Sequence, residues 1–448
     1  MASLISMDSA AAQALIRFGL GRRGSEAAPA DPRKWLLDQL DGPDPGLTSG
    51  AFRGLPTATQ ALRTERAEQI ARKRAIAAHA GKLPKPFAEY RREYFRDAAA
   101  QLHWASVTDA PFRERLVWFW TNHFTVSIHQ GGTLGLVGPY VREAIRPHVT
   151  GRFEDMVLAV MRHPAMLRYL DNAGSVGPDS PAGRRFHRGL NENLARECME
   201  LHTVSLAAHY TQADVTNMAR ILTGWSVNPA RPGGFMFRPF AHEPGSWTVL
   251  GHRFPPGEQG GIAALRFLAN HPSTHHELAV KLTRHFIADD PPADAVAHVE
   301  GVLRDTRGDL KAASAALVGL PAAWRPLAKL RTPLDYVVAS ARALDLPPGQ
   351  KVPMLGILRA LGQPLWAAPL PNGWADTAAA WSASDAIMRR VDWAYAFSGR
   401  AGHADPAELA QANLGPLLRP AVLTAIHRAA SRRDGVTMLL TSPEFQRR

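Results

Sequence analysis

The sequence of 448 residues contains a single cysteine, Cys198, so no disulfide can form within the chain. A lone thiol in an apolar helical stripe is usually a small core residue, and we expect Cys198 to be buried. No apolar run reaches about 18 residues, which excludes a transmembrane helix. The N-terminal apolar stretch is interrupted by Asp8, Gln13 and Arg17, and no basic segment precedes it. We therefore expect no signal peptide and a cytoplasmic location.

β-branched residues are scarce outside short runs, whereas alanine and leucine are abundant, and this balance favours helix. Residues 225–260 differ, because WSVNPARPGGFMFRPF and SWTVLGHRF are typical of a small β-hairpin or ribbon. We predict an all-α fold, a large multi-helix domain with a small β-ribbon insertion near 225–260. Its parts are N-terminal helices and a loop at 1–56, a helical core at 57–225, the ribbon at 226–260 and a C-terminal helical part at 261–448, joined in one continuous domain.

The net charge of +12 raises the question of an anionic partner such as nucleic acid, anionic lipid or an acidic substrate. Basic residues are spread along the whole chain with acidic residues between them, which indicates a generally basic composition. The most basic stretch is a pair of helices predicted at 57–80 and 87–106. We interpret this pair as the solvated face of a helical bundle, and we expect neither nucleic-acid binding nor membrane insertion.

The densest polar cluster is the predicted helix NENLARECMELHT. At about 100° per residue, Asn193, Glu197 and Glu200 fall on one side of this helix, with Arg196 beside them. Two carboxylates and an amide suit a divalent metal, and crowded carboxylates also suit acid/base chemistry because crowding raises one pKa. His202 would join this group only if the helix ended near Glu200. The alternative is a solvated face with Glu–Arg ion pairs.

Two further polar groups stand beside apolar segments. In FWTNHF, Asn122 and His123 lie among aromatic residues at a helix end, where burial demands a hydrogen-bond partner. We interpret His123 as a ligand or base that faces the carboxylate helix; the alternative is a satisfied core histidine. In YLDN, Asp171 opens a Gly-rich loop, where it either supplies a ligand oxygen or makes a turn.

The motifs resemble a bacterial family catalogued as domain of unknown function 1800. The resemblance covers nearly the whole chain and rests on FWTNHF (119–124), HPAMLRYLDN (163–172), GLNENLARECMELHT (189–203), YTQADV (210–215), ARILTGW (219–225) and HE…LG (242–251), with weaker matches at HPST…KL (271–282) and GWADT…W (373–381). It implies a large helical domain, often exported, and a protein of the alkaline-phosphatase-like superfamily, encoded nearby, as partner. It supplies no reaction.

We predict an enzyme, or the catalytic half of a two-protein system, that performs metal-assisted hydrolysis or acid/base chemistry on a polar or anionic substrate. Its site comprises catalytic His123, Arg196, Glu197 and Glu200, cofactor contacts from Asn122, Asn193 and His202, and a divalent metal at Asp171, Glu197 and Glu200. The alternative is a non-catalytic helical scaffold or accessory protein that binds a partner, with the polar motif as a structural network. The sequence does not decide between these two functions.

Overall fold

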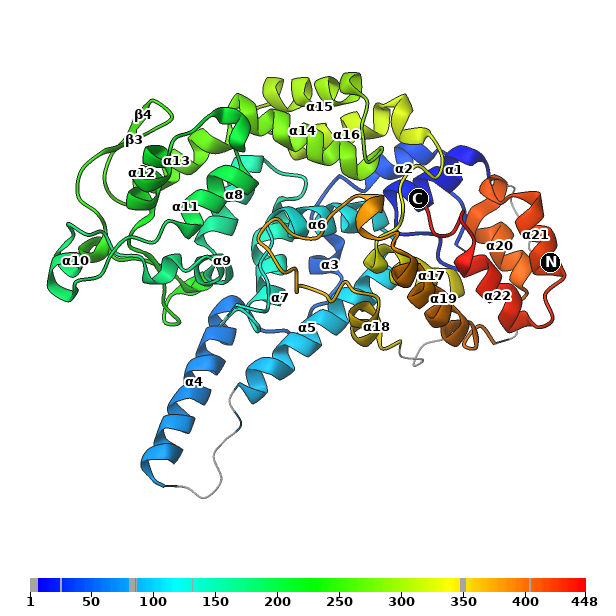
Figure 1. Ribbon diagram of the computed structural model, residues 1–448, viewed down its shortest axis with the longest axis horizontal. Helices are drawn as coiled ribbons and strands as arrows, with labels where there is room; N and C mark the ends of the chain where they lie inside the picture. Colours follow the sequence, from blue (N-terminus) through cyan, green and yellow to red (C-terminus); the bar gives the residue numbers. More distant parts are fainter. Residues whose placement is uncertain are drawn as a thin grey trace.

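The computed structural model of the chain describes residues 7–448, apart from 25, 80–84, 86, 131, 347–351 and 403. Helices build most of the described part, and its strands form two antiparallel pairs (Figure 1). The predicted all-α fold with a small β insertion is therefore confirmed. The insertion consists of two separate hairpins, in which β1 (Trp225–Val227) pairs with β2 (Phe235–Phe237) and β3 (Trp247–Val249) pairs with β4 (His252–Phe254).

The helices before the hairpins are α1 (Ser9–Gln13), α2 (Pro32–Asp38), α3 (Pro45–Thr48), α4 (Ala58–Ala77), α5 (Ala88–Val107), α6 (Pro111–His123), α7 (Val137–Tyr140), α8 (Phe153–Arg162), α9 (Pro164–Tyr169), α10 (Pro181–Phe186), α11 (Asn193–Glu197) and α12 (Gln212–Leu222). Those after the hairpins are α13 (Glu258–Ala269), α14 (Pro272–Phe286), α15 (Ala293–Asp305), α16 (Leu310–Gly319), α17 (Pro333–Leu344), α18 (Met354–Ala360), α19 (Ser384–Ser398), α20 (Pro406–Leu414), α21 (Pro420–His427) and α22 (Arg432–Thr441). π-helical turns occur at η1 (Ala14–Phe18), η2 (Val141–Ile145) and η5 (Cys198–His202).

Side-chain caps set several helix starts. At α12 the Asp214 carboxylate accepts a hydrogen bond from the Thr211 backbone N–H at 2.8 Å, and the Thr211 hydroxyl accepts one from the Asp214 N–H at 3.2 Å. Thr57 and Gln60 form the same capping box at α4. Such a pair satisfies two backbone N–H groups that no helical carbonyl reaches, which fixes the first turn.

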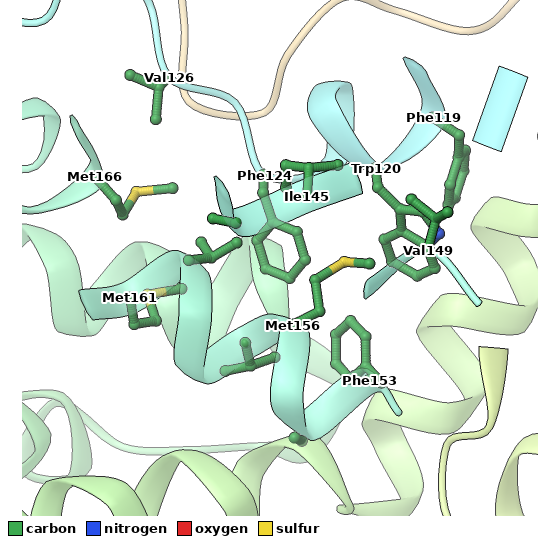
Figure 2. Close-up of a cluster of buried hydrophobic side chains, with 14 of the residues drawn as sticks. Phe119, Trp120, Phe124, Val126, Ile145, Val149, Phe153, Met156, Met161 and Met166 are labelled. Carbon is green, nitrogen blue, oxygen red and sulfur yellow. The ribbon is translucent and has the colours of Figure 1, made fainter. Parts of the chain in front are cut away.

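The main hydrophobic core packs against one face of α6, which contributes Phe112, Leu116 and Trp120 to it. Trp120 is 1% exposed and Phe124 is fully buried, and their ring centroids lie 5.6 and 5.9 Å from that of Phe153 in α8. Figure 2 shows these rings near Met156 and Met161, which lie on α8 like Phe153. The expected burial of Cys198 is confirmed, because its thiol belongs to this core.

A second cluster of buried side chains lies between α17, α19, α20 and α22. It includes Tyr336, Phe397 and Leu439, and it also takes Ile16 and Leu102 from the N-terminal part of the chain. Both cores thus combine segments that are distant in the sequence. The division of the chain into four segments stays a prediction.

Helices α4 and α5 lie antiparallel and form an arm that projects from the body (Figure 1). Their inner ends pack against η7 (Pro232–Gly234), α7 and α17, while residues 66–79 are exposed or half-buried. Residue 80 of the predicted helix lies outside the described residues. None of the helices in the described ranges combines the length and hydrophobicity that crossing a bilayer requires.

Candidate functional site

A cavity of about 480 Å³ lies beside the main core. Its lining comes from α5, α6, α14, the π-turn η5 and the start of α17, together with the loop 363–377, here called the covering loop. Its size suits a small-molecule ligand. The cavity is therefore the candidate functional site.

Two helix faces supply most of its polar groups. The residues of α6 that line the cavity include Arg115, Phe119, Asn122 and His123, and those of α14 are Glu277, Lys281, Arg284 and His285. Each set recurs at intervals of three or four residues, so each occupies one face of its helix. The opposite face of α6 is buried in the main core, which fixes the direction in which its polar residues point.

The pair of His285 and Asp376 is the most distinctive contact in the wall. His285 Nδ1 lies 2.8 Å from Asp376 Oδ2, and because a carboxylate only accepts, Nδ1 carries the proton and donates it. Burial, only partly offset by the charge of Asp376, lowers the pKa of His285 to about 4. His285 Nε2 is buried and has no hydrogen-bond partner among the described residues. The imidazole is therefore neutral, with a lone pair that nothing else uses.

Cations behind this pair keep Asp376 ionised. Lys329 Nζ and Arg448 Nη2 each lie 3.7 Å from Asp376 Oδ1. Burial alone would raise the pKa of Asp376, but His285, Lys329 and Arg448 together lower it below its ordinary value. Lys329 is in turn held by Asp289, at 2.6 Å. At neutral pH the pair consists of a carboxylate and a neutral imidazole.

A second buried carboxylate, Asp335 at the start of α17, joins two guanidinium groups. Arg115 Nη1 lies 2.7 Å from Asp335 Oδ1, and Arg448 Nε lies 3.2 Å from Asp335 Oδ2. These cations hold the pKa of Asp335 far below its usual range, although burial opposes them. Arg115 also donates to the Gly19 carbonyl at 2.7 and 2.9 Å. Arg448 thus links the Asp335 cluster to the His285–Asp376 pair.

Asn122 anchors the covering loop to α6. Its amide nitrogen donates to the Trp374 carbonyl at 2.9 Å, and its amide oxygen accepts from the Trp374 N–H at 2.8 Å. The neighbouring Gly373 has φ of +77°, and a Cβ there would lie 2.5 Å from the Asn122 carbonyl oxygen. Only glycine fits this position, because both the backbone angle and the space exclude a side chain. The Asn122 side-chain amide, which was predicted to contact a cofactor, is therefore hydrogen-bonded to the loop backbone.

Replacing Gly373 with alanine should lower the free energy of unfolding by about 1–3 kcal/mol, because the new methyl group meets the Asn122 backbone. Urea unfolding measures the difference. Gly362→Ala is the matched control: Gly362 lies at the start of the same loop with φ of +87°, but nothing lies within 4 Å of its Cβ position. If both variants lost the same free energy of unfolding, the cause would be the positive φ angle and not the contact of the methyl group with Asn122.

The π-turn η5 carries the polar motif to the cavity. A π-turn takes one more residue than an α-turn, so side chains after Glu197 are rotated from their positions on a regular helix. Glu200 consequently lines the cavity, and its carboxylate accepts a hydrogen bond from the Tyr210 hydroxyl at 3.1 Å. His202 is fully buried behind the wall. The helix loses its regular α-helical form here, which was the condition for His202 to join the polar group. The imidazole ring of His202 nevertheless packs in the core, beside Phe124.

His123 lies between the core and the cavity. Its Nε2 donates to the His202 carbonyl oxygen at 3.2 Å, and its ring packs 4.5 Å from Phe124 and 5.4 Å from Trp120. Burial, followed by the charge of Lys281, lowers the pKa of His123 well below its ordinary value. His123 is therefore a neutral histidine that is packed like a core residue and lines the cavity.

Comparisons with known proteins agree with the sequence motifs. A family model described as "Protein of unknown function (DUF1800)" matches residues 13–447. The chain belongs to this family. Searches of curated proteins and of solved structures found no match. Membership in DUF1800 thus identifies relatives of the chain but no reaction, and the chemistry of the site has to be argued from its geometry.

The other predicted site residues of this DUF1800 chain lie outside the cavity wall. Arg196 Nη2 pairs with Glu192 at 2.9 Å, which matches the alternative of a solvated face with ion pairs. Asn193 is exposed at the first turn of α11, and Glu197 is half-buried. Asp171 is exposed in a left-handed turn after α9, where its carboxylate accepts from Gln130 at 3.2 Å.

The predicted metal group is not assembled. Glu200 faces the cavity, whereas Asp171 and Glu197 do not line it. Among the residues that the structure describes, no three histidine, cysteine, aspartate or glutamate side chains are placed to hold a metal ion. Glu197 and Glu200 remain neighbours, because burial and then the charge of Glu200 raise the pKa of Glu197. Asp171 lies in a separate turn after α9, where it bonds to Gln130.

The residues that the sequence analysis missed are those of α14, α17 and the covering loop. His285 lies three residues after the weak motif at 271–282, and Asp376 lies inside the weak motif GWADT. These two DUF1800 motifs were the available signal. Nothing in the sequence indicated that segments 91 residues apart would meet at one hydrogen bond.

Proposed function

We propose that this DUF1800 protein is an enzyme that performs general acid/base chemistry in the cavity, with His285 as the base and Asp376 as its partner. The contact of 2.8 Å between His285 Nδ1 and Asp376 Oδ2 carries the proposal, because it fixes the tautomer that leaves Nε2 as a proton acceptor. A water molecule or substrate hydroxyl that reaches the buried Nε2 from the cavity would give its proton to it. Asp376 would then stabilise the imidazolium that forms.

The walls favour a substrate with an anionic group and an apolar part. Arg284 lines the cavity, and its Nε donates to the Asp289 carbonyl at 3.3 Å. Its two terminal nitrogens have no hydrogen-bond partner among the described residues, so they are available for a carboxylate or phosphate. The apolar side chains Trp118 and Leu365 form part of the same surface. An anion beside His285 would also raise the pKa of the imidazole toward neutrality, which makes it a stronger base.

Two residues of the original hypothesis keep a role in this proposal. Glu200 lines the cavity with its carboxylate and is a candidate second acid/base group. His123 forms part of the wall and positions the aromatic side of the site. For Arg196 and Glu197 we propose a supporting role in the helix that presents Glu200.

The second candidate function is a non-catalytic scaffold or accessory protein. It is favoured by the Asp335 cluster, in which carboxylate and guanidinium groups are bonded to one another as in a structural network. A scaffold of this kind would bind a protein partner, such as the alkaline-phosphatase-like protein that the family resemblance implies.

The experiment that separates the two functions compares His285→Ala and Asp376→Asn with the unchanged protein in a bacterial metabolite extract. Mass spectrometry should reveal a compound that the unchanged protein consumes at least about 100-fold faster than either variant. His276→Ala is the matched control, because His276 lies on the exposed side of α14. Equal consumption by the His285→Ala variant would contradict the assignment of the base, and no consumption by folded protein would favour the scaffold.

A further inference from the structure

A second cavity, of about 410 Å³, lies at the start of α14, at the opposite end of this helix from His285. Its lining combines the starts of α8 and α14 with the ends of α13 and α15 and the turn that follows α15. His275, in the first turn of α14, precedes His285 by ten residues, or about 15 Å along the helix axis. The two cavities have no described lining residue in common, so the second cavity is a separate place for a ligand.

His275 is a buried polar residue that lines the second cavity without a bonding partner. It is 4% exposed, and neither Nδ1 nor Nε2 has a hydrogen-bond partner among the described residues. Burying an unpaired polar group costs free energy, so such groups are rare in folded proteins. A neutral imidazole has one N–H to donate, and a ligand in the second cavity would accept it.

One wall of the second cavity is an ion pair that is already complete. Glu154 Oε1 lies 3.5 Å from Arg152 Nε, and Glu154 Oε2 accepts from the Asn270 amide at 2.6 Å. Arg152 Nη1 and Nη2 donate to the carbonyls of Thr306 and Arg307 at 3.4 and 2.6 Å, which fixes this guanidinium beside the turn after α15. Glu154 is the one acidic side chain among the described residues of the lining, and Arg152 balances its charge.

The two remaining arginines of the lining add positive charge. The Arg307 side chain is exposed and has no hydrogen-bond or ion-pair partner among the described residues. Arg304 Nε lies 3.0 Å from Asp305 in a solvent-exposed pair, which water screens. Glu300, on the same helix, is bonded to His276 at 2.7 Å. The starts of α8 and α14 add the partial positive charge of helix N-termini, so the second cavity favours an anion.

We infer that the second cavity binds the phosphate group of a small molecule. Arg304 and Arg307 supply charged donors from the end of α15 and the turn after it, and His275 supplies a neutral donor from α14. A free phosphate ion leaves most of the 410 Å³ empty, whereas a phosphate monoester would also place its organic part there. This inference is independent of the acid/base proposal, because it concerns a different cavity.

Other ligands explain fewer of these observations. Water would satisfy the His275 imidazole but would not balance Arg304 and Arg307. A metal cation would be repelled by the guanidinium groups, and the carboxylate of Glu154 is already paired. A carboxylate offers two oxygens in one plane, whereas the donors of the second cavity come from separate elements and suit a tetrahedral group with several oxygens.

Isothermal titration calorimetry of the full chain, in a buffer without phosphate, tests the inference with inorganic phosphate and with glycerol 3-phosphate. We expect saturable binding, which Arg307→Gly should weaken at least about tenfold because a charge-assisted hydrogen bond is lost. Glycine suits the φ of +54° at this position, so this variant should fold. His275→Phe keeps a ring but removes both nitrogens, and it should weaken binding by a similar factor. Tighter binding of glycerol 3-phosphate than of phosphate would identify a monoester as the ligand, and equal binding would identify the free ion.

Two controls locate the binding. Arg428→Gly removes the same charge from the exposed end of α21 and should bind phosphate like the unchanged protein. His285→Ala, in the other cavity, should also keep this binding. No phosphate binding by the folded chain, equal binding of glycerol and glycerol 3-phosphate, or binding that Arg284→Ala loses and Arg307→Gly keeps would each overturn the inference. Thermal unfolding checks the fold of every variant, and if one of the two test variants fails to fold, the other decides.

Discussion

Asp335→Asn should lower the free energy of unfolding by about 3–5 kcal/mol, because it removes the negative charge between two buried guanidinium groups. Arg115 is 2% exposed and Arg448 is fully buried, so neither can recover solvation by a small movement. Asparagine has nearly the same shape as aspartate and keeps the packing. A decrease in the free energy of unfolding can therefore be attributed to the lost charge. Urea unfolding at neutral pH measures the shift of the midpoint.

Two further variants separate charge from packing. Asp385→Asn is the control, because Asp385 forms an exposed i,i+4 pair with Arg389 and its loss should leave the midpoint unchanged. Arg115→Met should restore part of the stability of Asp335→Asn, since it removes one of the uncompensated cations. An Asp335→Asn protein as stable as the unchanged one would show that Arg448 and Arg115 are balanced by other groups, with Asp376 as the first candidate.

Composition and local sequence pattern were sufficient to predict most of the helical architecture. Abundant alanine and leucine with few β-branched residues predicted a helical fold, and the segment 225–260 predicted the β insertion. What periodicity could not predict is the π-turn at residues 198–202, since nothing in the local sequence requires the extra residue. The sequence therefore indicated a polar helix here but not its π-helical end.

The candidate site was harder to predict for the same kind of reason. Asn122 and His123 were found because polar groups among aromatic residues are conspicuous in a sequence. Asp335 and Asp376 were not identified as site residues, although Asp376 lies inside the weak motif GWADT. Each gains its character from partners elsewhere in the chain, which are Arg115 and Arg448 for Asp335 and His285 for Asp376. Charge pairs between distant segments leave no local pattern, whereas amphipathic helices do.

Lowering the pH from 7.5 to 5 should reduce the free energy of unfolding by at least about 3–5 kcal/mol, because burial lowers the pKa of several histidines in the folded protein. The most strongly affected are His123, His202 and His285, and His242 and His275 act in the same direction. Burial, followed by the charge of Lys281, lowers the pKa of His202 to about 3 and that of His123 well below its ordinary value. Burial also lowers the pKa of His285 to about 4. The unfolded chain takes up protons below its histidine pKa of about 6.5, and the folded chain does not.

The sign of the effect follows from this difference in bound protons. Each buried neutral histidine makes its full contribution to the free energy of unfolding above about pH 6.5. As the pH falls toward the folded pKa this contribution decreases, and at pH 5 it is about 2 kcal/mol smaller. Carboxyl groups with a raised pKa act in the opposite direction, because the folded protein binds their protons first; these are Glu93, Glu114 and Glu197. They reduce the net loss, but more histidines have a lowered pKa than carboxyl groups have a raised one.

Urea unfolding at a series of pH values between 7.5 and 5 checks this prediction. His285→Gln should flatten the curve by about 1–2 kcal/mol, because glutamine keeps a polar side chain but binds no proton in either state. His276→Ala, on the exposed side of α14, should leave the slope unchanged. A stability that is constant between pH 7.5 and 5 would mean that the buried imidazoles are protonated and paired in the folded protein. In that case His285 could not serve as a proton acceptor, and the base assigned to the cavity would have to be another residue.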